Sequence, residues 1–153
     1  MHASNNCVKK RVVLSEPRPR VWRALTDSNE FGAWFQVRFE QPFVAGVEIR
    51  GSITHPGYEH LIIGSVVEKM IPERYFSYRW HPHAIDPTHV YSAEPMTPVE
   101  FTLEESPAGT VLTIVESGFE RIRLARQADA LKGNDVGWTA QVNAIDSHLR
   151  RCP

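Results

Sequence analysis

Cysteine is scarce in this chain: only Cys7 and Cys152 occur among its 153 residues. No apolar segment precedes the first strand-like stretch, so the start of the sequence does not resemble a secretory signal. The two ends of a compact domain can meet, but without an export signal two reduced thiols are expected rather than a disulfide. A cytoplasmic protein is therefore expected.

Long apolar runs and a strong net charge are also missing. No uninterrupted apolar stretch approaches the roughly 18 residues that indicate a membrane span. The formal net charge is −1, which argues against non-specific binding to nucleic acid. Basic residues concentrate toward the two ends of the chain, a distribution that either steers a partner or reflects solvated faces. We expect no membrane and no nucleic-acid partner.

Motifs for nucleotide binding and nucleophilic catalysis are not found. No glycine-rich run matches a phosphate cradle or a dinucleotide fingerprint. Asp146, Ser147 and His148 are consecutive in a predicted helix and therefore point in different directions. The strained G-x-S-x-G turn of serine hydrolases is also missing. A catalytic triad is not expected.

Histidines gather in a proline-rich segment between residues 81 and 98. His81, His83 and His89 surround Asp86, and imidazoles two residues apart in an extended segment can share a metal. No cysteine lies nearby, and no helical H-x-x-x-H pair supports the site. These residues are interpreted as surface histidines of a loop, and no metal or cofactor is expected.

The chain is long enough for one domain, which we expect to cover residues 1–153 with its core between about 8 and 150. Val8–Leu14 is rich in β-branched residues and predicts a first strand. "SEPRPRVWRALT" predicts a helix with Ser15 as its cap, because prolines are tolerated only in the first turn. "DSNEFGAWF" predicts a short second helix capped by Asp27 or Ser28.

Five strand-like runs follow these two helices. They are Val47–Ile53, Leu61–Met70, the stretch "IPERYFSYRW", Val99–Leu103 and the stretch "TVLTIVESGF". Four prolines between residues 81 and 98 forbid regular pairing over most of that segment. Short strands joined mainly by tight turns favour an antiparallel sheet.

The last thirty residues predict a long amphipathic helix. Trp138, Val142, Ile145 and Leu149 recur at intervals of four, three and four, which gives one face for a core. Gly133 and Gly137 are poor helix formers, so a kink or break is expected there. The predicted order is β-α-α-β-β-β-β-β-α, with this helix packed across the concave face of the sheet.

Four stretches, "PRVWRALTDSNEFGAWF", "GSVVEKMIPERYFSYRW", "GTVLTIVESGF" and "VGWTAQVNAIDSHL", resemble the START-like (SRPBCC, helix-grip) superfamily in their order and spacing. The most similar branch contains homologues of the activator of the ninety-kilodalton heat-shock protein's ATPase (AHSA-type domains). The resemblance runs from about Val8 to Leu149. It implies an α+β helix-grip fold: a curved antiparallel six-stranded sheet around a long C-terminal helix, with two short helices after the first strand.

The resemblance also implies a cavity between the sheet and the C-terminal helix. Mapping the strand alternation onto that fold gives the expected ligand-binding residues. They are Trp34, Phe35, Phe76, Tyr78, Trp80, Val99, Phe101, Leu103, Leu112, Ile114, Glu116, Trp138, Gln141 and Val142. Alternatively, these side chains simply fill the core of a domain that needs their apolar surface for stability.

Glu116 continues the face of Leu112 and Ile114 and raises a specific question. It is either a strand end that has reached water or a polar group inside an apolar cavity. An interior carboxylate needs a partner, for which Glu68 and Arg79 are the candidate neighbours. Our hypothesis is that Glu116 is the polar anchor of the cavity, where it orients a ligand or acts as a general base.

Several functions fit such a domain. The superfamily includes lipid carriers, hormone receptors and polyketide cyclases, which implies binding of a small hydrophobic or aromatic molecule, or a polyketide cyclase/aromatase-like reaction. The branch name implies a chaperone partner instead. Eukaryotic co-chaperones of that branch carry an additional N-terminal domain, so ligand binding is favoured here. Either a monomer or a homodimer is expected, and Lys9, Lys10 and Arg11 oppose pairing of the first strand between copies.

Overall fold

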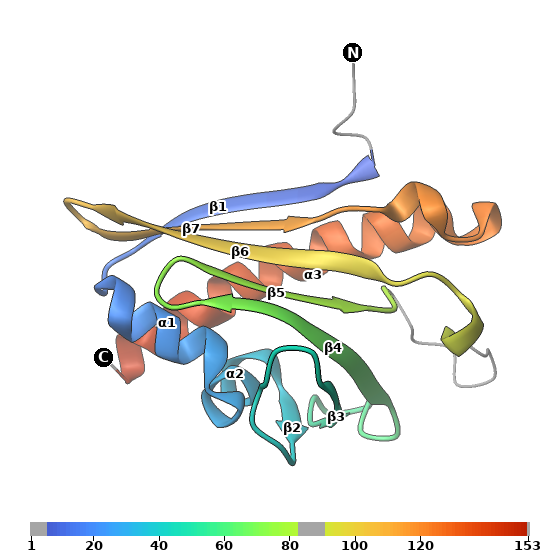
Figure 1. Ribbon diagram of the computed structural model, residues 1–153, viewed down its shortest axis with the longest axis horizontal. Coiled ribbons are helices and arrows are strands. Elements are labelled where there is room, and N and C mark those ends of the chain that lie inside the picture. Colours follow the sequence, from blue (N-terminus) through green and yellow to red (C-terminus); the bar gives the residue numbers. More distant parts are fainter. Residues whose placement is uncertain (1–5, 83–90, 153) are drawn as a thin grey trace.

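The computed structural model describes residues 6–82 and 91–152. They form an antiparallel seven-stranded sheet, two short helices after the first strand and a long C-terminal helix (Figure 1). The strand order is β1-β7-β6-β5-β4-β3-β2, and every neighbouring pair is antiparallel. The α+β helix-grip fold that the sequence motifs imply is confirmed.

The helices and strands follow one another closely in the chain. They are β1 (Val8–Leu14), α1 (Arg18–Thr26), α2 (Ser28–Phe35), β2 (Val37–Phe39), β3 (Glu48–Ile53), β4 (Ile62–Ile71), β5 (Tyr75–Trp80), β6 (Thr97–Ser106), β7 (Gly109–Glu116) and α3 (Leu124–Arg151). The expected sheet of six strands is one strand short, because β2 was not predicted. Three residues give too little alternation to be read from the sequence. Gln36, in the left-handed conformation (φ 64°), ends α2 directly before β2.

The two short helices begin differently from each other. Ser15 does not cap α1. The residue directly before the helix is Pro17, and no side chain forms a hydrogen bond with the first turn. Asp27 caps α2 as expected, with its Oδ1 accepting hydrogen bonds from the backbone N–H of Asn29 (2.9 Å) and Glu30 (3.1 Å). A side-chain cap of this kind satisfies donors that the first turn of a helix otherwise leaves free.

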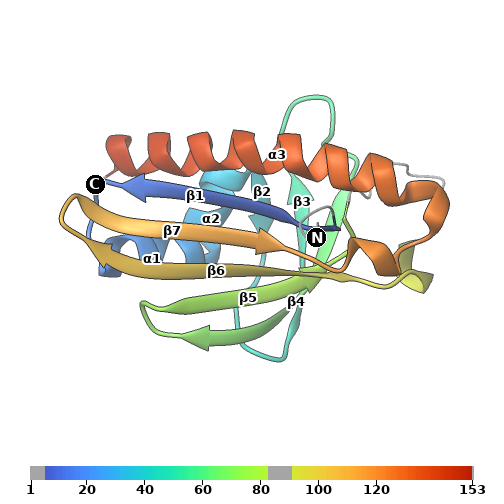
Figure 2. The same ribbon diagram turned by 90° about the horizontal axis from the view of Figure 1, so that it is seen from above.

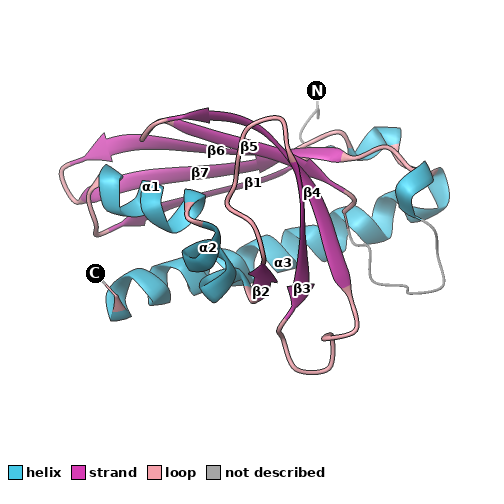
Figure 3. Ribbon diagram, turned by 60° about the horizontal axis from the view of Figure 1, so that its bottom comes forward, coloured by secondary structure: helices cyan, strands magenta, loops and turns pink. Residues whose placement is uncertain are grey.

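The sheet bends within β4, whose first half pairs with β3 and whose second half pairs with β5. Val67 pairs with Tyr78 and Lys69 with Ser77, so Glu68 is an extra residue in a β-bulge. A bulge bends the strand and increases its twist. Beyond it, β4 and β3 turn away from the direction of β6, β7 and β1 (Figure 3). The concave face of the sheet therefore has two parts, one along α3 and one beside α2.

Helix α3 lies along the sheet as a single continuous helix (Figure 2). Its expected core face is confirmed, since Trp138, Ile145 and Leu149 are buried. The expected break at Gly133 and Gly137 is wrong, because both residues lie within the helix. Packing of this face against the sheet outweighs the roughly 1 kcal/mol of helix stability that each glycine costs. Across residues 6–82 and 91–152, no helix combines the length and apolar character of a membrane span.

Cys7 and Cys152 are not joined to each other by a disulfide. Cys7 directly precedes β1 and Cys152 directly follows α3. The start of β1 and the end of α3 lie at opposite ends of the molecule (Figure 2). A disulfide needs Cα atoms within about 7 Å, so this fold keeps the two thiols apart.

Gly137 provides a test of how the continuous helix is stabilised. It is exposed, and a Cβ built on it meets no atom within 4 Å. Gly137→Ala should therefore raise the free energy of unfolding by about 0.5–1 kcal/mol in urea titrations. Gly118→Ala is the opposing control, because φ is +83° there and the new Cβ would lie 2.7 Å from Arg121 Nη2. A less stable Gly137→Ala protein would contradict this account of the helix.

Glu30 joins α2 to both of the other helices. Its Oε1 lies 2.8 Å from Nε2 of His148 on α3, and its Oε2 accepts a hydrogen bond from Arg23 Nε at 2.7 Å. Arg20 Nη1 lies 2.8 Å from the same Oε1, and Arg20 Nε donates to the Cys152 carbonyl at 3.1 Å. Burial acts to raise the pKa of Glu30, but hydrogen bonds from His148, Arg23 and Arg20 outweigh it and lower the pKa below its usual value.

This lowered pKa predicts a contribution to stability that is present near neutral pH and is lost at low pH. A carboxylate whose pKa is lower in the folded state stabilises the fold above its unfolded value, near 4.5, and the contribution is lost as pH falls through the folded value. Between about pH 6 and about pH 3, the free energy of unfolding should fall more steeply in the wild type than in Glu30→Gln. Denaturant titrations across that range measure both slopes. Equal slopes would show that the Glu30 cluster contributes nothing.

Candidate functional site

An apolar cavity lies inside the molecule, between α2, β2, the segment after β2 and the inner face of β3, β4 and β5. Its volume is about 10 Å³, which is room for about one water molecule. No charged side chain lines it. The lining residues are Phe31, Phe35, Phe39, Phe43, Ile49, Ile63, Ser65, Val67, Phe76, Tyr78 and Trp80. The cavity is therefore narrow, and a ring-sized molecule enters it only if a side chain moves.

The cavity lies beside α2 rather than under α3. Four of the expected residues line it: Phe35, Phe76, Tyr78 and Trp80. The other expected residues lie elsewhere in the interior. Val99, Phe101, Leu103, Leu112 and Ile114 are buried core residues on β6 and β7, Trp34 is buried on α2, Trp138 is buried on α3, and Gln141 and Val142 are partly buried there. This cavity thus differs in place from the one expected between the sheet and the C-terminal helix, where side chains of β6, β7 and α3 form a common core.

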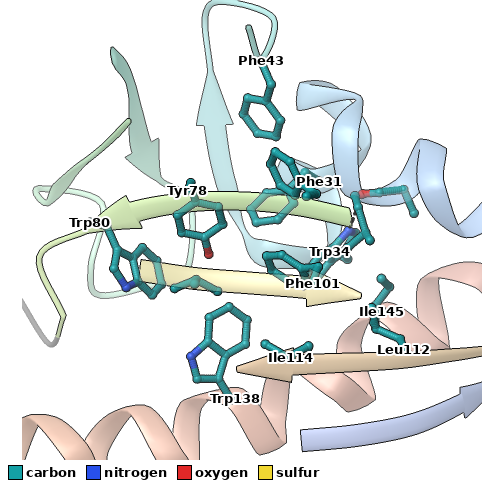
Figure 4. Close-up of a cluster of buried hydrophobic side chains, with 14 of the residues drawn as sticks. Phe31, Trp34, Phe43, Tyr78, Trp80, Phe101, Leu112, Ile114, Trp138 and Ile145 are labelled. Carbon is teal, nitrogen blue, oxygen red and sulfur yellow. Dashed lines mark hydrogen bonds between the residues drawn. The ribbon is translucent and has the colours of Figure 1, made fainter. Parts of the chain in front are cut away.

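Phe43 is the lining residue that the sequence analysis missed and that has the most bearing on access. It lies between β2 and β3, outside regular structure, and is 8% exposed. Its ring centroid lies 5.5 Å from that of Phe31, 5.1 Å from Phe39 and 5.8 Å from Phe76 (Figure 4). A single aromatic residue in the otherwise loop-like stretch "EQPFVAG" is the signal that could have indicated it.

Glu116 is completely buried, which excludes the hydrated strand end. It ends β7, opposite Val99 of β6 and Val8 of β1. Its Oε1 accepts hydrogen bonds from Asn134 Nδ2 (2.8 Å) and Trp138 Nε1 (2.9 Å) of α3. Asn134 and Trp138 lie one helical turn apart and therefore share a face of α3.

The other carboxylate oxygen of Glu116 bonds to the sheet. Oε2 accepts hydrogen bonds from Trp80 Nε1 (2.7 Å) on β5 and from Thr97 Oγ1 (2.6 Å) on β6. Trp80 and Thr97 are paired across the two strands. Four donors occupy the four lone-pair positions that an ionised carboxylate offers. Glu116 is thus fully satisfied by the protein itself and has no lone pair left for a ligand.

The partners that were expected for Glu116 are wrong. Arg79 Nε lies 3.8 Å from Glu68 Oε2, and both side chains are 41% exposed, away from the buried carboxylate. Asn134 and Thr97 were missed by the sequence analysis. Asn134 could have been found from its spacing of four before Trp138, but Thr97 depends on the register of β5 and β6. No cation of the described part of the chain lies within salt-bridge distance of Glu116.

Tyr78 contributes a hydroxyl to a wall that consists mainly of aromatic and aliphatic side chains. Its hydroxyl is buried and has no hydrogen-bond partner among the described residues. In Figure 4 this hydroxyl points toward Trp80, which also lines the cavity, and toward Trp138 of α3, which does not. Burial, and next the charge of Glu116, raise the pKa of Tyr78 well above its ordinary value. The phenol therefore stays protonated and able to donate.

Most of the histidine pattern lies outside the described residues, and the triad pattern does not converge. His81 Nε2 lies 3.0 Å from the carbonyl oxygen of Glu94, whereas His83, Asp86 and His89 lie outside the described residues. No cluster that could hold a metal ion occurs within residues 6–82 and 91–152. His148 contacts Glu30, while Asp146 accepts a hydrogen bond from Arg150 at 3.0 Å, so these side chains serve separate contacts.

Arg126 anchors both sides of the proline-rich segment to the start of α3. Its guanidinium lies 2.9 Å from Glu94 Oε1 and donates to the carbonyl of Pro82 at 3.2 Å. It also lies over the ring of Tyr91, 4.8 Å from the centroid. Pro82 lies two residues after Trp80, so these contacts hold the backbone that follows Trp80 against the start of α3.

The Glu116 network predicts a large effect of a small substitution. In Glu116→Gln an amide replaces one acceptor oxygen, and at least one indole N–H then loses its partner. The free energy of unfolding should fall by about 1–3 kcal/mol, measured by denaturant titration together with near-ultraviolet circular dichroism of the tryptophans. Glu104→Gln on the exposed face of β6 is the matched control, expected within about 0.5 kcal/mol of the wild type. Equal stability of the two variants would contradict the network.

Comparison with known proteins gives a consistent family and fold. No curated protein sequence matches the chain. Protein MLL2253 from Mesorhizobium loti is 25% identical and superposes with a TM-score of 0.76, covering 96% of this chain and 98% of that one. DynU16, from the dynemicin biosynthetic locus, is 20% identical with a TM-score of 0.72, and the match covers 95% of this chain and 47% of DynU16.

A third solved structure and a family profile complete the comparison. The dimeric Aha1 protein from Colwellia psychrerythraea is 16% identical, with a TM-score of 0.68 and 92% of each chain covered. At such identities these two likenesses concern the fold alone. The profile described as "Activator of Hsp90 ATPase homolog 1-like protein" matches residues 15–150. The chain therefore belongs to the family of Activator of Hsp90 ATPase homolog 1-like proteins.

Proposed function

We propose that the protein binds a small aromatic molecule in the cavity beside α2. The observation that carries this proposal is the composition of the wall. Seven of the eleven lining side chains are aromatic, and none is charged. Small-molecule sites typically combine such an apolar wall with a few polar groups.

Entry of the ligand requires Phe43 to move. The neighbouring walls are held by α2 and by the paired strands β3, β4 and β5, whereas Phe43 lies in the irregular segment between β2 and β3. Pro42 precedes it, and near it the backbone of the segment is tied to β4 by the hydrogen bond from Gly46 N to Val67 O (2.7 Å). Turning the Phe43 ring outward joins the narrow cavity to the surface. This motion breaks ring contacts but no backbone ladder.

A catalytic role for Glu116 has little support. A general base needs a free lone pair within reach of the proton that it abstracts. All four positions of the Glu116 carboxylate are occupied by Trp80, Thr97, Asn134 and Trp138. Binding is therefore a better proposal than a polyketide cyclase-like reaction based on this residue.

A chaperone partner is the competing proposal, because the family description refers to activation of the Hsp90 ATPase. The two proposals are separated by assaying one protein preparation for both activities. We expect aromatic probes to raise the melting temperature and the protein to leave the chaperone ATPase rate unchanged. Stimulation of the ATPase without any ligand-dependent stabilisation would reverse this conclusion.

Phe43→Ala tests the entry route. The substitution should lower the free energy of unfolding by about 3–5 kcal/mol. It should also bind acetophenone about tenfold more tightly than the wild type, because the ligand no longer displaces the ring. Titrations followed by ¹⁵N chemical shifts measure both affinities, with Val44→Ala, at an exposed neighbour, as the control.

The wild type decides the outcome of this test. It should bind acetophenone measurably at millimolar concentrations, with shift changes at the residues around the cavity. If Phe43→Ala bound the probe and the wild type did not bind it at all, the cavity would be a product of the substitution. The proposed function would then be wrong.

A further inference from the structure

We infer that the ligand is a neutral, ring-sized aromatic compound bearing one hydrogen-bond acceptor, such as a ketone or ester oxygen, which accepts a hydrogen bond from the Tyr78 hydroxyl. This inference rests on the proposed function and specifies the ligand of the same site. It follows from three properties of the interior: an unpaired donor, a buried negative charge and a wall without cations.

The unpaired donor is the Tyr78 hydroxyl. Tyr78 lies on β5, and its ring packs edge-on against Trp80 (5.3 Å between centroids) and Phe31 (6.3 Å). These contacts fix the direction of the hydroxyl, which points toward Trp80 and Trp138 (Figure 4). Buried hydroxyl groups are normally hydrogen-bonded, and this one has no partner among the described residues. A ligand acceptor placed beside Trp80, the lining residue toward which the hydroxyl points, would satisfy it.

The buried negative charge is that of Glu116. Its four hydrogen bonds come from neutral groups, namely two indoles, an amide and a hydroxyl. Its charge acts on Tyr78, whose raised pKa reflects burial first and Glu116 next. A ligand carboxylate near Tyr78 would therefore meet a like charge in a medium of low dielectric constant.

The wall itself offers nothing to balance a ligand charge. The lining residues are phenylalanines, aliphatic residues, Ser65, Tyr78 and Trp80. An unpaired carboxylate or ammonium is costly to bury without a partner. An ammonium group has donors but no acceptor for the Tyr78 hydroxyl, and the four lone-pair positions of Glu116 are already occupied. A neutral acceptor is the ligand type that satisfies both conditions.

Four probes of almost equal shape test this assignment. Acetophenone carries the acceptor, α-methylstyrene replaces the ketone oxygen by a methylene group, benzoate carries a negative charge and 1-phenylethylammonium carries a positive one. Their affinities for the full-length wild-type protein are measured by ¹⁵N chemical-shift titration. We expect acetophenone to bind roughly fivefold to tenfold more tightly than α-methylstyrene, as one net hydrogen bond would provide. Both charged probes should bind at least tenfold more weakly than acetophenone.

Tyr78→Phe provides the decisive variant, because it removes only the hydroxyl. The preference for acetophenone over α-methylstyrene should fall to about one in this variant, while α-methylstyrene keeps its affinity. The ligand-free variant should melt at or above the wild-type temperature, since a buried hydroxyl without a partner is lost. Tyr75→Phe is the matched control: it lies on the same strand with its hydroxyl bonded to Glu100 at 2.5 Å, and should leave the preference unchanged.

The possible results separate this inference from the proposed function. If the neutral probes bind and Tyr78→Phe keeps the full preference for acetophenone, the role of Tyr78 is wrong and the cavity proposal stands. If benzoate or 1-phenylethylammonium binds more tightly than acetophenone, the assignment of a neutral ligand is wrong. If no probe binds the wild type at all, the proposed function fails and this inference fails with it.

Discussion

The buried carboxylate of Glu116 is the interaction on which the rest of the interior depends. It ends β7, and its two oxygens bind donors from β5, β6 and α3, so one side chain joins the end of the sheet to the long helix. Buried carboxylates are usually balanced by a cation, whereas here neutral donors alone satisfy the group. Its negative charge therefore remains in the interior and determines which kinds of molecule can be accommodated nearby.

The two parts of the concave face have different roles. Along β6 and β7 the buried side chains pack against α3, and the Glu116 network is the polar connection within this part of the core. Beyond the bulge at Glu68 the sheet turns toward α2, and there the aromatic rings enclose a narrow cavity. Phe43 closes that cavity from an irregular segment. The ring that has to move in the proposed entry route thus lies outside the paired strands.

The sequence predicted those features that depend on local periodicity. Alternation along β7 places Leu112, Ile114 and Glu116 on one face, and all three are buried. Features that depend on tertiary contacts were missed or wrong: β2 is too short to show alternation, and Thr97 reaches Glu116 only through strand register. The expected break at Gly137 reflected helix propensity alone, which packing of α3 overrides. The family resemblance implied a cavity under α3, and periodicity does not reveal the bulge that redirects the sheet.

The central claim is that a neutral aromatic molecule enters the interior of the wild-type protein beside Tyr78. The most direct measurement is a set of intermolecular nuclear Overhauser effects between acetophenone and the isotope-labelled wild-type chain. We expect contacts from the probe to the rings of Phe31, Phe43 and Tyr78, which surround the cavity. Contacts confined to exposed residues such as Ile62 and Leu124, with none to those rings, would contradict the account.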